Sequence, residues 1–166
     1  MYKKVSFALF VYLLGSLPAY GQNDITCYVV AISDGDTFTC LSAEKTQLKI
    51  RLEEIDAPEK NQPFGTQSRR YLGKLIHNKQ IHLTTSGYDR YHRILATAYN
   101  SEGLNINLQM VRAGMAWAYT PYVRNPVYFT AQKNAQRRQA GLWQSPNPIP
   151  PSQWRHKKPS FNGREK

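Results

Sequence analysis

The sequence Ser33-Asp34-Gly35-Asp36-Thr37 separates two segments, residues 25–33 and 37–41, in which apolar residues alternate with polar ones. An Asp-Gly pair between two such segments is a strong short-range signal for a β-hairpin. The alternation predicts that both segments are strands, so a tight turn presents the two aspartates.

The rest of the chain continues with strand and helix patterns. A third strand is expected at residues 47–55, and its apolar positions change parity near Glu53-Glu54, which predicts a bulge or the end of the strand there. Apolar spacing predicts helices at residues 65–78, 104–112 and 126–140, and further strands around residues 81–83 and 94–98. Five strands with helices after the third and fifth indicate an α+β fold, for which a small five-stranded barrel is a natural closure.

Acidic residues are concentrated in one segment of this basic chain. The net charge is +11, yet seven of the eleven acidic residues lie between positions 34 and 59: Asp34, Asp36, Glu44, Glu53, Glu54, Asp56 and Glu59. Carboxylate oxygens without nearby histidine or cysteine favour Ca²⁺ over Zn²⁺. Basic residues spread along the rest of the chain give a salt-sensitive attraction to phosphate. These features indicate a metal-dependent enzyme acting on nucleic acid.

The first 21 residues have the pattern of a secretory signal peptide. Lys3 and Lys4 precede an apolar core at residues 5–14, and small residues at Ala19 and Gly21 suit a cleavage site. A membrane-spanning helix needs about 20 apolar residues, which this segment does not supply. We therefore expect an exported protein, either periplasmic or secreted.

The expected mature chain has the length of one compact domain. We place that domain at residues 22–143 and a basic, Pro-rich, extended tail at residues 144–166. Cys27 and Cys40 would pair in an oxidising compartment. Their parity places them on one face, but they are diagonal unless the turn is longer or bulged, and two buried thiols are the alternative.

Five motifs follow one another along the chain. They are Asp34-Gly35-Asp36-Thr37, then Arg51 with Ile55-Asp56-Ala57-Pro58-Glu59, then Pro63-Phe64-Gly65, Asp89-Arg90-Tyr91-His92-Arg93 and Val111-Arg112-Ala113-Gly114-Met115-Ala116. In this order and spacing they resemble the staphylococcal nuclease family over roughly residues 26–155. Gly141-Leu142-Trp143 and Pro151-Ser152-Gln153-Trp154-Arg155 also resemble the end of bacterial members. The resemblance implies an OB-fold barrel of five strands with three helices, in agreement with the pattern above.

The resemblance also implies a metal site and a catalytic glutamate. By matching position, Asp36, Asp56 and the main-chain carbonyl of Ala57 would hold Ca²⁺. Taken singly, Asp36 also suits a turn beside glycine and Asp56 a loop before proline. Glu59 matches the family glutamate near the attacking water, where it either removes a proton or only orients the water.

Arginines and tyrosines would bind the substrate. Arg51 and Arg93 match the family arginines that hold the scissile phosphate, a role that suits the planar, permanently charged guanidinium. The resemblance further assigns nucleotide binding to Asp34, Arg90, Tyr91, Tyr119 and Tyr122. His92 stands where the family usually has glycine, so a positive φ there would be strained.

The function implied by the resemblance is that of an exported, Ca²⁺-dependent phosphodiesterase. It would act as a monomer on DNA and RNA with little sequence specificity, favour single-stranded substrate and leave 3′-phosphate products. One alternative is an OB-fold module that binds nucleic acid without cleaving it. Another is a cationic protein that binds membranes or polyanions, which would need no cluster of carboxylates and usually carries a basic amphipathic helix.

Overall fold

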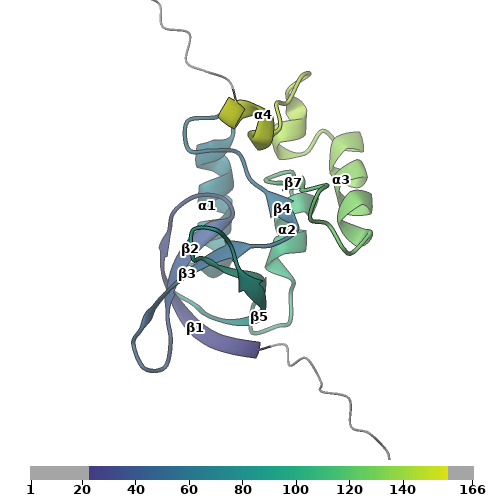
Figure 1. The fold of residues 1–166 in the computed structure, drawn as a ribbon. Coiled ribbons are helices and arrows are strands. Elements are labelled where there is room, and N and C mark those ends of the chain that lie inside the picture. Colours follow the sequence, from purple (N-terminus) through teal and green to yellow (C-terminus); the bar gives the residue numbers. More distant parts are fainter. Residues whose placement is uncertain (1–22, 157–166) are drawn as a thin grey trace, which may run out of the picture.

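The fold is a closed five-stranded barrel with helices packed around it and a separate two-stranded sheet (Figure 1). The computed structural model describes residues 23–156, so the expected signal peptide lies outside the described residues. Within that range, none of the helices has the length and apolarity needed to cross a bilayer. The α+β barrel predicted from the sequence is confirmed.

Barrel strands run in the order β1-β2-β3-β6-β5 and close on themselves. Their bounds are β1 (Asn23–Ile32), β2 (Thr37–Leu41), β3 (Gln47–Leu52), β5 (Gln80–Tyr88) and β6 (Ile94–Tyr99). The β3–β6 pair is parallel and the other pairs are antiparallel. The third strand ends at Leu52, as the change of parity predicted, because Glu54 adopts a positive φ of 62° and turns the chain.

Three helices occur close to the predicted positions: α1 (Gly65–Ile76), α2 (Ile106–Arg112) and α3 (Val127–Arg137). Their apolar faces, which include Leu72 and Met110, are buried in the same core as the inward residues of the barrel. Gly114 follows α2 with φ of 66°, and a Cβ there would lie 2.0 Å from the carbonyl oxygen of Ala140. Glycine therefore permits both the turn and the close contact with the chain that follows α3.

A short sheet joins the middle of the chain to its C-terminal part. In this sheet β4 (Ile55–Asp56) pairs with β7 (Trp117–Ala118). The Trp117 ring packs edge-on against Trp143 of the 3₁₀ helix η1 (Gly141–Gln144), with ring centroids 4.3 Å apart. This contact holds the C-terminal segment beside the acidic segment around Asp56.

The C-terminal segment differs from the expected extended tail. Residues 151–156 form a fourth helix, α4 (Pro151–His156). Pro151 suits a helix start because its φ is fixed and it has no N–H that needs a hydrogen-bond partner, and the residue is buried. Local polarity predicted a tail, whereas packing against distant residues produces the helix.

Cys27 and Cys40 form a disulfide, as predicted from the compartment. The register explains how they meet, because Cys40 pairs with Val29 and a bulge follows Val29 in β1. The cysteines are therefore diagonal neighbours on the core face, and the turn between the strands has four residues, 33–36. The hairpin is longer and bulged, yet the cysteines remain diagonal, and their Cα atoms, 5.7 Å apart, are at an ordinary distance for a disulfide.

Reduction of this disulfide should destabilise the barrel. A closed loop of about 15 residues is worth about 3 kcal/mol in the chain-entropy account, and these cysteines are 13 residues apart. Urea unfolding with and without a reductant measures the difference in the free energy of unfolding. A Cys27→Ala/Cys40→Ala control should not respond to the reductant, and an unchanged wild-type midpoint would contradict the prediction.

Candidate active site

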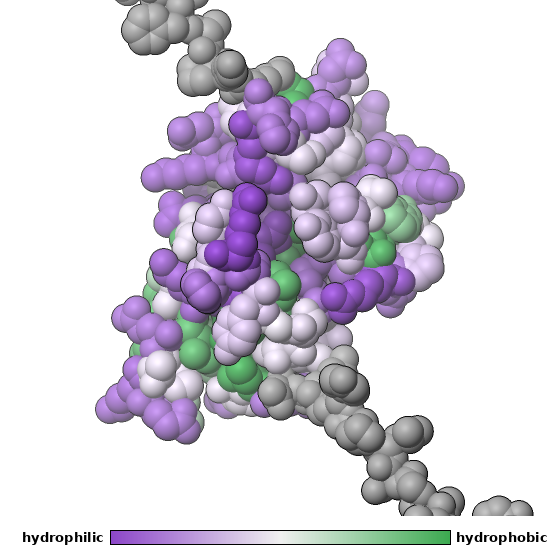
Figure 2. All heavy atoms as spheres, in the orientation of Figure 1, coloured by the Kyte–Doolittle hydropathy of each residue, from purple (hydrophilic) through white to green (hydrophobic). Residues whose placement is uncertain are grey.

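One cleft of about 660 Å³ contains all the residues that the sequence analysis assigned to a site, and its size suits a nucleotide-sized ligand. These residues are Asp34, Asp36, Arg51, Asp56, Ala57, Glu59, Arg90, Tyr91, Arg93, Tyr119 and Tyr122. They come from the β1–β2 turn, the end of β3 with β4 and the loop after it, the β5–β6 turn and the segment before α3. Figure 2 shows strongly hydrophilic residues running down the middle of one face, with residues of intermediate hydropathy beside them.

A hydrogen bond from the main chain joins the two acidic motifs, and a side-chain bond within the first motif orients its aspartate. The backbone N–H of Ala57 donates to Asp36 Oδ2 at 2.7 Å, and the hydroxyl of Thr37 donates to Asp36 Oδ1 at 3.1 Å. Gly35 permits this approach, because a Cβ there would lie 1.8 Å from Ser68 Oγ and 2.8 Å from Ala57 Cβ. The turn is therefore pressed against α1 and the loop after β4.

Arg51 lies between the two aspartates that were predicted to bind metal. Its Nη2 is 3.1 Å from Asp36 Oδ2 and 3.3 Å from Asp56 Oδ1. Its Nη1 donates to the carbonyl oxygens of Leu52 and, at 2.9 Å, Ile55. One cationic group thus contacts both carboxylates while the main chain holds it in place.

Arg155 is a site residue that the sequence analysis did not assign. Its Nη2 is 3.0 Å from Asp56 Oδ2, and its Nη1 is 2.6 Å from Glu59 Oε1. Burial raises the pKa of Asp56, and the hydrogen bonds from Arg155 oppose that rise. Burial also disfavours the charge on Arg155, but its bonds to the two carboxylates outweigh this and hold its pKa above the ordinary value. The one sequence signal for Arg155 was its place at the end of the Pro151-Ser152-Gln153-Trp154-Arg155 motif.

Arg93 is held by its neighbour Asp89. The Arg93 Nε donates to Asp89 Oδ2 at 2.7 Å, and Asp89 Oδ1 accepts the backbone N–H groups of Tyr91 and Arg93. Burial alone would raise the pKa of Asp89, yet these hydrogen bonds lower it below the ordinary value. His92 does adopt a positive φ, 57°, so histidine occupies the conformation that favours glycine. Three N–H groups of this turn nevertheless donate to the Asp89 carboxylate, and these bonds fix Arg93.

Aromatic rings border the cleft. Tyr91 and Tyr122 are exposed, and the rings of Tyr119 and Tyr122 lie 4.9 Å apart. The guanidinium carbons of Arg90 and Arg93 are 4.8 and 5.4 Å from the Tyr91 ring centroid. Exposed aromatic faces beside cations suit unpaired bases joined by phosphates. Tyr88, also exposed in this cleft, was missed, although it directly precedes the Asp89 motif.

Three other carboxylates of the acidic segment, those of Glu44, Glu53 and Glu54, have different surroundings. Glu44 is in an exposed turn, and Glu53 accepts hydrogen bonds from Ser86 and Thr97. Glu54 is buried and accepts the backbone N–H groups of residues 124 and 125 at 2.6 and 2.8 Å. These three carboxylates, which are not among the predicted metal ligands, therefore have structural partners or face solvent.

Glu54 orders the segment that carries two of the tyrosines. Its carbonyl oxygen accepts the N–H of Tyr119, while its carboxylate fixes the end of the loop before α3. We predict that Glu54→Ala lowers the free energy of unfolding by about 1–3 kcal/mol, because two backbone donors lose a buried acceptor. Denaturant unfolding tests this. Glu54→Gln should lose less stability, because its amide oxygen still accepts the two N–H groups. The free energy of unfolding of Glu44→Ala, at an exposed position, should match that of the wild type.

Asp34 should titrate near neutrality in protein kept free of divalent cations. Burial and the adjacent Asp36 carboxylate raise its pKa to about 7 from 3.8. The folded state then keeps a proton that the unfolded state loses, so this group's stabilising effect is full below about pH 4 and is lost as pH rises through about 7. Asp34→Asn should flatten this part of the stability–pH curve. Carbon NMR of the carboxyl group measures the pKa, and titration near 3.8 would contradict the prediction.

Comparison with known proteins agrees with this geometry. The family described as "Staphylococcal nuclease homologue" matches residues 49–145. A Haemophilus influenzae protein named "Uncharacterized endonuclease" is 48% identical over 153 residues, which cover 92% of this chain and 85% of that protein. A Shigella flexneri protein named "Micrococcal nuclease" is 37% identical over 155 residues, 87% of each chain. On this evidence the chain belongs to the staphylococcal nuclease family.

Proposed function

We propose that this protein is an exported, Ca²⁺-dependent nuclease that hydrolyses phosphodiester bonds of DNA and RNA. The observation that carries the proposal is the convergence of Arg51 and Arg93 with Asp36, Asp56 and Glu59 in one cleft. Family membership and the relatives named as nucleases support nucleic acid as the substrate.

The carboxylates suit a calcium ion in their chemistry and spacing. Among residues 23–156, no three His, Cys, Asp or Glu side chains form a metal-binding group by themselves. The proposed set is instead Asp36, Asp56 and the main-chain carbonyl of Ala57, all oxygen donors. Arg51 Nη2 contacts both carboxylates, which indicates that one cation is able to reach both. Bound there, Ca²⁺ would supply positive charge next to the phosphate.

The remaining side chains have separate roles in this proposal. Arg51 and Arg93 bind the phosphate and stabilise the charge that develops on it during in-line attack. Glu59 orients the attacking water or takes its proton. Water is the nucleophile, so no covalent enzyme intermediate forms. The family resemblance supports 3′-phosphate products.

Substrate selection would depend on charge and stacking rather than on base identity. Tyr91, Tyr119 and Tyr122 offer faces for unpaired bases, and each stacked base is worth about 1–3 kcal/mol. Phosphate contacts carry no sequence information. We therefore propose little sequence specificity, a preference for single-stranded substrate and action as a monomer.

We predict that the purified protein cleaves single-stranded DNA with Ca²⁺ and loses nearly all activity in EDTA. Glu59→Gln should lower kcat by about 10²–10⁴, the usual contribution of a general base. Glu44→Gln removes the same charge from an exposed turn outside the cleft, and its rate should match the wild type.

Two results would count against this function. Full activity in EDTA would remove the role of the metal. Tight, salt-sensitive binding of DNA without cleavage, under all metal conditions, would indicate a nucleic-acid-binding module instead.

A further inference from the structure

The segment after η1, residues 145–156, brings a positive charge into the cleft. We call this segment the C-terminal arm. It ends in α4, the last helix of the chain that Figure 1 labels. Arg155 is the residue of the arm that lines the cleft. Its two carboxylate partners are 99 and 96 residues earlier in the sequence.

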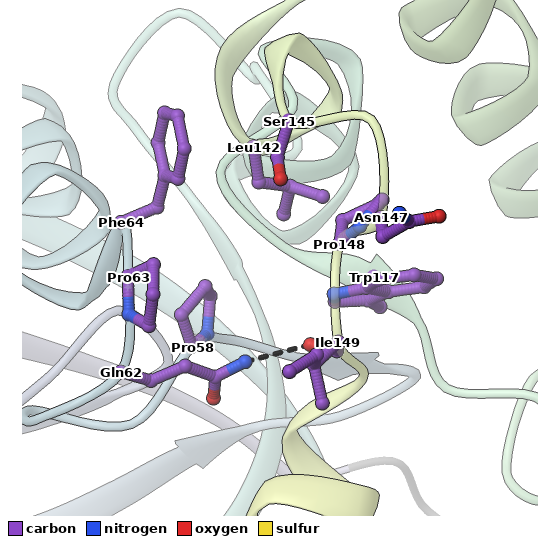
Figure 3. Close-up of a pocket in the computed structure, with 10 residues that line it drawn as sticks. All are labelled: Pro58, Gln62, Pro63, Phe64, Trp117, Leu142, Ser145, Asn147, Pro148 and Ile149. Atoms are coloured by element: carbon purple, nitrogen blue, oxygen red, sulfur yellow. Dashed lines mark hydrogen bonds between the residues drawn. The ribbon is translucent and has the colours of Figure 1, made fainter.

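Gln62 attaches the arm to the loop that carries Glu59. Its Nε2 donates to the carbonyl oxygen of Ile149 at 2.7 Å, and its Oε1 accepts the Glu59 backbone N–H at 3.1 Å. Figure 3 shows this bond beside the side chains of Pro58 and Pro63, across from Pro148. The arm and the Glu59 loop are therefore held by the same buried amide.

Arg155 contacts both carboxylate oxygens of Asp56. Its Nη1 is 3.3 Å from Oδ1 and its Nη2 is 3.0 Å from Oδ2, while Nη1 also reaches Glu59. A guanidinium and a divalent cation both bind carboxylates through these oxygens. With Arg155 in this position, a cation has to compete for Asp56.

Of the two arginines at Asp56, Arg155 is the one that is able to leave. The Arg51 side chain is 13% exposed and donates to two backbone carbonyls, whereas the Arg155 side chain is 41% exposed and donates to the two carboxylates. Asp56 is 4% exposed, so loss of Arg155 without a replacement would leave a poorly compensated buried charge. A divalent cation would supply that replacement.

We propose that Arg155 is the internal counter-ion of the cation site, which Ca²⁺ must displace from Asp56 and Glu59 in order to bind. This inference rests on the proposed calcium site. Arg155 is a positioning residue: without a cation it holds the two carboxylates together, and it sets the calcium concentration that the enzyme requires.

Calorimetric titration of Ca²⁺ into the metal-free protein, without nucleic acid, tests the competition. Arg155→Gln should bind Ca²⁺ about tenfold more tightly than the wild type, equivalent to about 1.4 kcal/mol. Arg155→Lys keeps the charge but loses the two-pronged contact, so its affinity should fall between the two. Arg70→Gln is the control, because it removes the same charge from an exposed site outside the cleft and should leave the affinity unchanged.

The outcomes separate this inference from the proposed function. If the wild type and Arg155→Gln bind Ca²⁺ equally, or if Arg155→Gln binds it more weakly, the competition is disproved while the calcium site stands. If Arg70→Gln also bound Ca²⁺ about tenfold more tightly, the cause would be the change in net charge, and the inference would be overturned. If none of these proteins binds Ca²⁺, the proposed metal dependence itself fails. Unfolding curves of each variant verify that the barrel is intact.

Discussion

The hydrogen bond from the Ala57 backbone to the Asp36 carboxylate joins the two acidic segments on which the cleft depends. It links a hairpin turn to a loop 21 residues later, and it is buried. Its geometry requires Gly35, because any larger residue would collide with Ser68 and Ala57. A backbone N–H has one position once the fold is set, so this bond fixes Asp36 more firmly than a contact between two flexible side chains would.

Charge compensation is the second constraint. Asp36 and Asp56 are both buried, and a buried carboxylate without a partner costs several kcal/mol. Arg51 compensates both, and Arg155 adds charge on the outer side of Asp56. Burial still raises the pKa of Asp56, which indicates that the arginines only partly offset the loss of hydration. The proposed cation site would therefore require internal counter-ions whenever the cation is absent.

Local sequence signals predicted the barrel well because strands and turns depend on neighbouring residues. The hairpin at Asp34-Gly35, the end of the third strand and the glycine after α2 all follow from alternation, parity and allowed φ. The motif residues met in one cleft as expected. The sequence did not reveal the partners of Glu53 and Glu54, which are hydroxyls and backbone N–H groups from distant segments.

Arg155 shows why the remaining part of the site was not predictable. The residue follows a proline-rich stretch whose local pattern indicates an extended tail. Its position results from a chain of tertiary contacts: Trp143 on Trp117, β7 on β4, and the Gln62 amide on the Ile149 carbonyl. None of these contacts leaves a periodic trace in the sequence. The cleft is therefore built from the chain on both sides of residue 143, and the C-terminal arm is part of the domain that forms it rather than an appendage to it.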